Sequence, residues 1–221
     1  MNRGRFLFPK WANKVFPIVL VLGGGGATAG AAALGYYGST AYLEVGYTPV
    51  QPVPYSHKLH AGELGIDCRY CHSTAERSSF AQVPPVQTCM NCHSKVKPDS
   101  LKLLPVREAY AKDEPLKWTL IHNLPDFVYF NHSAHLASGV GCSSCHGRVD
   151  QMVTVSQVAP LSMGWCLDCH RNPAPVIRDP ADVTKMDWKA SPEQLAAVDA
   201  HPPLKNGRKA NPPTTCSGCH R

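Results

Sequence analysis

Aromatic residues are scarce in this chain. They make up 8% of its 221 residues, whereas proline and glycine occur 20 and 17 times. Large apolar side chains build most protein cores, and Pro and Gly interrupt the helices and strands that bury them. The composition therefore argues against an ordinary self-sufficient core. The sequence also contains no phosphate-binding loop and no Ser-His-Asp signature, so nothing in it indicates nucleotide hydrolysis or acyl transfer.

Positive charge is sparse outside the N-terminus. The formal net charge is +6, and Arg3, Arg5, Lys10 and Lys14 supply four of these charges, which leaves about +2 for the rest. Domains that bind nucleic acid carry a concentrated basic patch. We therefore expect no nucleic-acid partner.

Cysteine occurs only within one repeated motif. The pentapeptide C-x-x-C-H appears five times and uses all ten cysteines. We call these motifs first to fifth; they are residues 68–72, 89–93, 142–146, 166–170 and 216–220. C-x-x-C-H is the attachment signature of c-type haem, in which two thiols bond to porphyrin vinyl groups and the histidine binds the iron. Zinc knuckles and disulfides also use paired cysteines, but neither explains the five histidines.

The motifs predict five covalent haem c groups and their protein ligands. The expected attachment residues are Cys68, Cys71, Cys89, Cys92, Cys142, Cys145, Cys166, Cys169, Cys216 and Cys219. The expected proximal iron ligands are His72, His93, His146, His170 and His220. No catalytic residue is predicted.

Haem must replace the missing apolar core. Residues 45–221 supply about 35 residues per haem, too few for a self-sufficient core. We therefore predict a multihaem cytochrome c, with irregular loops and short α-helices around a five-haem array, and one N-terminal transmembrane helix. The ten or so haem propionates would be neutralised by many of the remaining Lys and Arg side chains.

An uncharged segment covers residues 15–43, longer than the roughly 20 residues needed to cross a bilayer. The flanking positive charges are N-terminal, so the positive-inside rule leaves the N-terminus in the cytoplasm and exports the haem domain. We expect a single-pass anchor in a bacterial inner membrane with the haems on the periplasmic side. A cleaved signal peptide is the alternative. The run Gly-Gly-Gly-Gly-Ala-Thr-Ala-Gly favours close packing in a larger complex.

The predicted domain organisation follows from these features. It comprises a cytoplasmic N-terminus (1–14), an anchor (15–43), an extended Pro-rich linker (44–54) and a pentahaem domain (55–221).

The pentahaem domain contains an internal duplication. YSHKLHAGELGIDCRYCH and FNHSAHLASGVGCSSCH share an aromatic residue, a His-x-x-His pair and a haem motif, and a second motif follows each after 16 or 19 residues. The two-haem modules span about 55–93 and 129–170, and the fifth haem lies at 216–220.

The His-x-x-His pairs predict the distal iron ligands. Residues three apart on a helical turn can reach two neighbouring irons. We assign His57, His60, His132 and His135 to four haems. For the fifth haem we prefer His122, in an apolar run. The alternatives are His201, then Met163 or Met152, and a methionine ligand would make that haem the most oxidising of the set.

Two helices are expected outside the motifs. Leu101, Leu104 and Tyr110 have helical spacing within residues 100–112. Ser191-Pro192-Glu193-Gln194 is a capping-box start, which predicts a short helix ending near residue 200.

The strings HNLPDFVYFNHSAHLASGVGCSSCHG and LSMGWCLDCHRNP resemble the pentahaem cytochrome c subunit of bacterial alternative complex III, a quinol-oxidising respiratory complex. The resemblance is strong over residues 50–175, whereas the anchor and fifth motif agree in arrangement more than in residues. It implies docking against an iron-sulfur protein and multispanning quinol-binding membrane subunits. Electrons would leave toward a cytochrome c, a copper protein or a terminal oxidase.

The predicted function is electron transfer within that complex, so the chain would not be an enzyme by itself. One alternative is a self-standing, membrane-anchored quinol dehydrogenase. Another is a multihaem redox enzyme, which needs an open axial position on one iron. Six histidines lie outside the motifs, and five haems are expected. The histidines are therefore enough to give every iron a second axial ligand.

Overall fold

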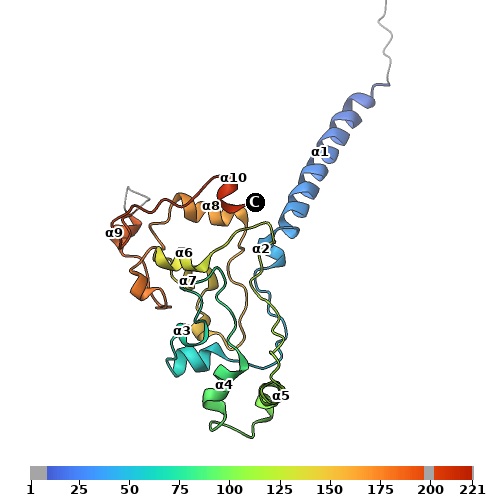
Figure 1. The fold of residues 1–221 in the computed structure, drawn as a ribbon. Helices are drawn as coiled ribbons and strands as arrows, with labels where there is room; N and C mark the ends of the chain where they lie inside the picture. The colour runs from blue at the N-terminus through green and yellow to red at the C-terminus, as the bar shows by residue number, and fades with distance from the viewer. Residues whose placement is uncertain (1–8, 197–201, 221) are drawn as a thin grey trace, which may run out of the picture. The chain divides into compact units, whose positions relative to one another are not determined.

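The computed structural model describes residues 9–196 and 202–220 and divides the chain into two units, residues 1–43 and 44–221. Every regular element in the described residues is a helix (Figure 1). The α-helices are α1 Ala12–Tyr37, α2 Thr40–Leu43, α3 Cys68–Cys71, α4 Val86–His93, α5 Leu104–Lys112, α6 His132–Ala137, α7 Ser143–His146, α8 Met163–Arg171, α9 Pro192–Leu195 and α10 Cys216–Cys219. A π-helix, η1 Lys58–Glu63, and three 3-10 turns, η2 Leu101–Leu103, η3 Val149–Gln151 and η4 Pro180–Asp182, complete the set.

The first unit contains the predicted apolar helix. α1 has 26 residues, about 39 Å at about 1.5 Å per residue, which exceeds the roughly 30 Å of a hydrocarbon core. Its most apolar stretch has a mean hydropathy of 1.7, and none of its residues is buried. By length and composition, α1 is able to span a membrane.

Three short helices in the second unit begin where a polar side chain accepts a hydrogen bond from a backbone amide two or three residues later. Asp67, Asn131 and Ser162 cap α3, α6 and α8 in this way. Ser191 and Gln194 form the predicted capping box at the start of α9, while the predicted end of that helix lies outside the described residues. The helix predicted over residues 100–112 is confirmed as η2 followed by α5.

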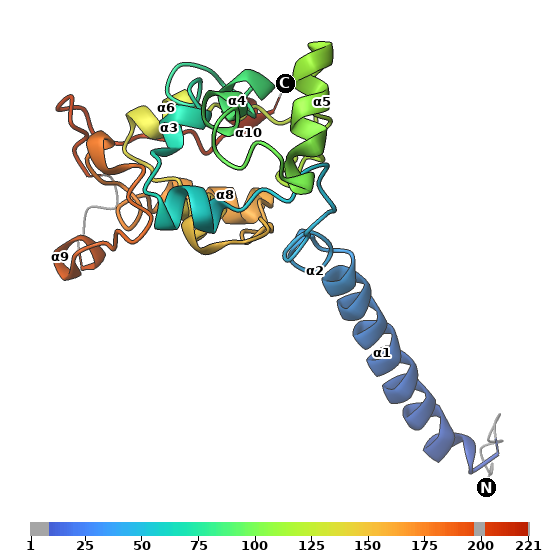
Figure 2. The same cartoon turned by 90° about the horizontal axis from the view of Figure 1, so that it is seen from below.

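The apolar core of the second unit is small. Only eight apolar residues are buried in the described part of the chain. Val53, Val86 and Val106 form one cluster, through which α4 and α5 pack side by side (Figure 1, Figure 2). Val53 belongs to the predicted linker. The side chain of nearby Gln51 donates a hydrogen bond to the Thr119 carbonyl at 2.9 Å and accepts one from the Thr119 backbone amide at 3.0 Å. The linker residues are therefore packed against the domain.

A buried arginine organises the segment after the fourth motif. Arg178 is only 7% exposed and donates a hydrogen bond to the Lys185 carbonyl at 3.0 Å. Its guanidinium stacks over the Trp188 ring, 4.1 Å from the centroid. Gly139 and Gly141 leave no room for a Cβ beside the Arg178 backbone and guanidinium respectively. These two glycines allow the chain to pass close to the arginine.

The beginning of the second unit is fastened by Gln157, which is 3% exposed. The backbone amide of Gly46 donates a hydrogen bond to the backbone carbonyl of Gln157 at 2.7 Å. The backbone amide of Gln157 donates one to the Tyr47 carbonyl at 3.1 Å. The Gln157 side chain donates to the Glu44 carboxylate at 3.2 Å and to the Ala159 carbonyl at 3.1 Å.

Candidate functional site

All five C-x-x-C-H motifs coincide with a short helix. The first to fifth motifs lie on α3, α4, α7, α8 and α10. Residues three apart lie on the same side of a helix, so one turn presents both thiols of a motif to a common partner. All ten cysteines are free, which leaves the disulfide interpretation without support. Among residues 9–196 and 202–220, no three Cys, His, Asp or Glu side chains converge as zinc ligands would.

Four of the five motif histidines face a histidine of a His-x-x-His pair. The ring centroids are 6.5 Å apart for His57 and His72, 6.2 Å for His60 and His93, 6.4 Å for His132 and His146, and 6.1 Å for His135 and His170. The first and third of these pairs are nearly parallel, at 2° and 7°. The structure thus pairs each of the four His-x-x-His histidines with one motif histidine, a matching that the sequence did not specify.

The separation of the paired rings matches two imidazoles on opposite sides of one iron. A metal–imidazole bond is about 2 Å long and the ring centroid lies about 1.1 Å beyond the nitrogen, so the two centroids should be about 6.2 Å apart. The four observed distances span 6.1–6.5 Å. Rotation about the metal–nitrogen bonds changes the angle between the rings and not this distance. The residues present therefore fit a six-coordinate haem iron.

The second ring nitrogen of most of these histidines has a backbone partner. Nδ1 lies within hydrogen-bonding distance of a carbonyl oxygen in six cases: His60 with Ser56, 2.9 Å; His72 with Gln82, 2.7 Å; His93 with Val96, 2.9 Å; His132 with Ser79, 2.8 Å; His135 with Asn131, 2.8 Å; and His170 with Pro213, 2.6 Å. A carbonyl only accepts, so Nδ1 must donate, and the Nε2 lone pair is left for a metal. Metal-binding histidines commonly have this outer partner.

An aromatic side chain holds each His-x-x-His pair. Tyr55 stacks on His60 at 4.4 Å and meets the edge of His57 at 4.8 Å. Phe130 contacts His135 and His132 in the same way, at 4.5 and 4.7 Å. The repeated sequence contained this aromatic residue, but its contacts with both histidines of the pair are visible only in the structure.

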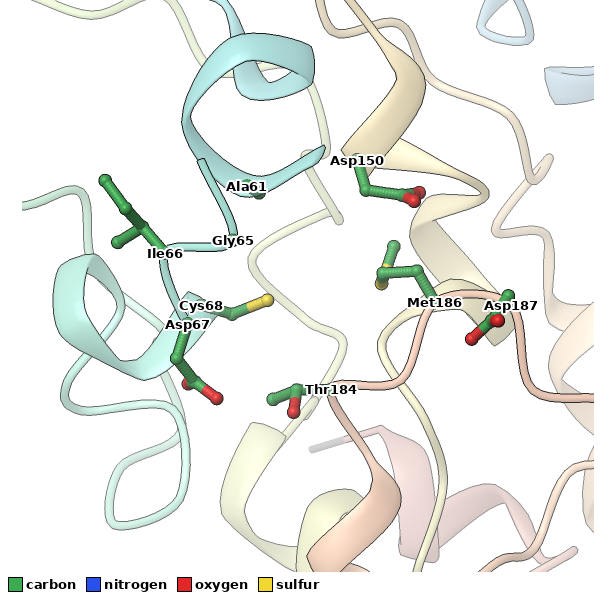
Figure 3. A pocket seen from close by; sticks show the side chains of 9 residues that line it. All are labelled: Ala61, Gly65, Ile66, Asp67, Cys68, Asp150, Thr184, Met186 and Asp187. Atoms are coloured by element: carbon green, nitrogen blue, oxygen red, sulfur yellow. The ribbon is translucent and has the colours of Figure 1, made fainter. Parts of the chain in front are cut away.

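Cys68 shows where a porphyrin vinyl group could reach the protein. Its thiol points into a pocket that Asp150, Thr184 and Met186 border on the other side (Figure 3). The pocket joins the first motif to the segments around the third motif. An opening at a thiol is what covalent attachment of a large planar ligand requires.

Burial favours the neutral form of the ligand histidines. It lowers the pKa of His146 to about 3, with repulsion from His122 and His132 adding to the effect. It lowers the pKa of His57 to about 4, with smaller contributions from His72 and His60. A neutral imidazole keeps the lone pair that binds a metal.

Burial also acts on the thiols of the third motif. It raises the pKa of Cys142 to about 11 and that of Cys145 to about 12, with neighbouring cysteines as the next causes. Both thiols are half-buried.

The fifth motif differs from the other four. His220 faces the Phe127 ring at 5.7 Å, and the Cys219 carbonyl accepts a hydrogen bond from Tyr129 at 2.8 Å. His122, the preferred fifth ligand, lies with its ring 4.3 Å from His146, and its Nε2 is buried without a hydrogen-bond partner. The structure places His122 beside the third motif.

The other three candidates for the fifth ligand lie in different places. Met163 begins α8 with 66% of its surface exposed, and Met152 follows η3. His201 lies outside the described residues. The fifth distal ligand thus stays a prediction.

Comparison with known proteins identifies relatives for about half of the chain. The class III cytochrome c family matches residues 107–220. The menaquinone reductase multihaem cytochrome c subunit of Nitratidesulfovibrio vulgaris strain Hildenborough is 36% identical over 114 residues, covering 50% of this chain and 52% of that protein. The chain thus spans about half the length of this curated relative.

Proposed function

Since the chain belongs to the class III cytochrome c family, we propose that it is the electron-transfer subunit of a membrane quinol-oxidising complex and conducts electrons through five c-type haems. Membership of the family implies c-type haem and electron transport. The number of haems, the complex and the direction of transfer are the finer parts of the proposal. The four facing histidine pairs are the observation that carries it, because their spacing suits closed, six-coordinate irons.

Each protein group has one task in this proposal. The ten motif cysteines bond the porphyrins, and the five motif histidines bind the irons from one side. His57, His60, His132 and His135 bind four irons from the other side. Each haem iron, when bound, takes up and releases one electron between its ferric and ferrous forms.

The surrounding residues keep these ligands in place. Tyr55 and Phe130 restrict the rings of the distal histidines, and the backbone carbonyls orient the Nδ1 protons. A ligand held in this way needs little rearrangement when the charge on the metal changes. Closed irons with rigid ligands suit electron transfer better than substrate binding, which needs an open position.

The proposed location is a bacterial inner membrane. α1 supports an anchor by its length and apolar composition, and the basic N-terminal residues support a cytoplasmic N-terminus with the haem domain on the periplasmic side. The resemblance to the subunit of alternative complex III supports iron-sulfur and multispanning quinol-binding partners. A cytochrome c, a copper protein or a terminal oxidase would accept the electrons.

A second candidate has electrons running in the opposite direction. The relative from Nitratidesulfovibrio vulgaris is named as a subunit of a menaquinone reductase, which delivers electrons to the quinone. The same set of ligands serves either direction, because the potentials of the outer partners decide which way electrons move. We favour quinol oxidation on the residues shared with alternative complex III.

The test uses the complex purified in mild detergent. We expect iron-sulfur and multispanning subunits to co-purify, and a menaquinol analogue to reduce the haems at the turnover rate. Reduced complex that passes electrons to added menaquinone, while quinol leaves the haems oxidised, would establish the reverse direction instead. Reduction of the isolated subunit by quinol at the full rate would replace the proposal with a self-standing quinol dehydrogenase.

A further inference from the structure

The two motifs of each module are neighbours because one turn serves both. His57 and His60 lie at the start of η1 and face the first and second motifs respectively. The two motifs also touch directly, since Asn91 of the second donates a hydrogen bond to the Tyr70 hydroxyl of the first at 3.0 Å. In the other module, His132 and His135 of α6 join the third and fourth motifs in the same way.

The two modules meet through the first and third motifs. His132, the partner of the third motif, is bonded through Nδ1 to the Ser79 carbonyl at 2.8 Å, in the loop that follows the first motif. η1 packs against η3, which follows the third motif: the Lys58 amide donates to the Met152 carbonyl at 2.9 Å, and Gly62 leaves no room for a Cβ beside Asp150.

The fifth motif extends the array from the fourth. Nδ1 of His170 lies 2.6 Å from the carbonyl oxygen of Pro213, three residues before the fifth motif. Pro213 in turn packs against Gly218, inside that motif. The fourth and fifth motifs are therefore joined by the same short segment.

The arrangement of the helices that carry the motifs agrees with these contacts. In the view of Figure 1, α4, α3, α7, α8 and α10 follow one another from the bottom of the domain to its top.

From these contacts we infer that the five motifs form one unbranched row in the order second, first, third, fourth, fifth. The inference deepens the proposed function and rests on its assignment of haems to these motifs. The order in space differs from the order in the chain, because the first motif lies inside the row and the second lies at its end. The second and fifth motifs are thus the two sites where an external one-electron donor and acceptor meet the array.

The exposure of the cysteines agrees with this order. Of the ten, only Cys92 and Cys216 are exposed, and they belong to the second and fifth motifs. The second motif contacts the first motif on one side. On another side, Cys89 and Met90 pack against the cluster of Val53, Val86 and Val106, to which α5 contributes Val106.

The first experiment locates the irons in the unmodified protein. Anomalous scattering at the iron edge in crystals of the holoprotein should show the four shortest iron–iron separations between motifs two and one, one and three, three and four, and four and five. A shortest separation from the second motif to the third or fourth would overturn the order.

A second experiment compares two histidines of one turn. His60→Ala alters the iron of the second motif, at the end of the row, and should shift the midpoint potential of one other haem. His57→Ala alters the iron of the first motif, inside the row, and should shift two. NMR signals of the haem methyl groups resolve the individual potentials during a redox titration. If both variants shifted the midpoint potentials of the same number of other haems, the proposed row would be contradicted.

Neither measurement involves quinol or a partner subunit. The proposed order of the motifs could therefore be wrong while quinol still reduces the haems of the complex. The order could equally be right while quinol does not reduce them, and the two experiments distinguish these results. If a variant matures with fewer than five haems, the iron positions in the unmodified protein decide the question.

Discussion

The guanidinium of Arg178 lies directly beside Gly141, in the space that a side chain at this position would need. Gly141 immediately precedes the third motif, and Arg178 is bonded to Lys185 and stacked on Trp188. Gly141→Ala must displace this buried cation or shift the backbone. We expect a loss of about 1–3 kcal/mol in the free energy of unfolding, measured by urea denaturation with haem absorbance as the signal.

Gly164→Ala is the matched control for that change. Gly164 lies near the start of α8, beside the fourth motif, and no atom lies within 4 Å of the place that a Cβ would occupy there. Alanine is the better helix former by roughly 0.5–1 kcal/mol, so this variant should be as stable as the parent or slightly more so. Equal losses in both variants would mean that the Arg178 contact contributes nothing specific.

The haem content gives a direct count. The pyridine haemochrome of the mature protein should correspond to five haems per chain, because five motifs offer thiols on a helical turn. Cys216→Ala combined with Cys219→Ala should reduce the count to four, because α10 then offers no attachment thiol. Four or fewer haems in fully matured parent protein would contradict the assignment.

Removal of one distal imidazole should open one iron. His135→Ala leaves His170 without the ring that faces it at 6.1 Å, so one haem becomes high-spin and binds carbon monoxide. Ser133→Ala, on the same helix, removes only a hydrogen bond to Asn131 and should leave every iron closed. Carbon monoxide difference spectra separate the two results, and no binding in the His135 variant would refute its role.

Phe130 should act as a positioning residue. Its ring stacks on His135 and meets the edge of His132, so Phe130→Ala frees both imidazoles to rotate. We expect a partial high-spin signal in electron paramagnetic resonance and a shifted potential, while the haem count stays the same. Phe130→Tyr keeps the ring and should restore the parent spectrum; if it does not, the stacking is incidental.

Acid should weaken one ion pair at the junction of the modules. Arg148 donates to both oxygens of Asp150, at 2.8 and 2.6 Å, and lowers the pKa of Asp150 below its ordinary 3.8. The pair therefore stabilises the fold above about pH 4, and its contribution is lost as the pH falls through the lowered pKa. Solvent screens this partly exposed pair, so we expect its contribution to be small.

The measurement compares the parent with Asp150→Asn in urea denaturation at pH 7 and pH 3. The parent should be more stable at pH 7, and the difference should shrink at pH 3. A constant difference would show that the carboxylate does not titrate in this range.

Local patterns underlie the prediction of the haem ligands. The spacing in C-x-x-C-H and His-x-x-His is a property of one helical turn, so His57, His60, His132 and His135 could be assigned to four haems from the sequence alone. The capping box at Ser191 is equally local. In contrast, the carbonyl partners on Ser79, Gln82 and Pro213 were not predictable, because every residue has a carbonyl and its direction depends on the folded backbone.

Long-range packing explains the other differences. Val53 read as part of an extended Pro-rich linker, yet it is buried because α4 and α5 each present a valine to it. His122 was chosen for its apolar surroundings, and it is half-buried, but those surroundings lie at the third motif. Hydropathy indicates that a residue is covered and does not identify the residues that cover it.

Gln157 gives the beginning of the haem domain a particular mechanical property. Its two backbone hydrogen bonds, to Gly46 and Tyr47, join the first residues of the unit to a segment more than 100 residues later in the sequence. A pull on Glu44 loads both bonds, so the force passes into the segment between the third and fourth motifs before it can extend the chain toward the first. A load that leaves these two bonds intact therefore does not stretch residues 48–57, the chain between Tyr47 and η1.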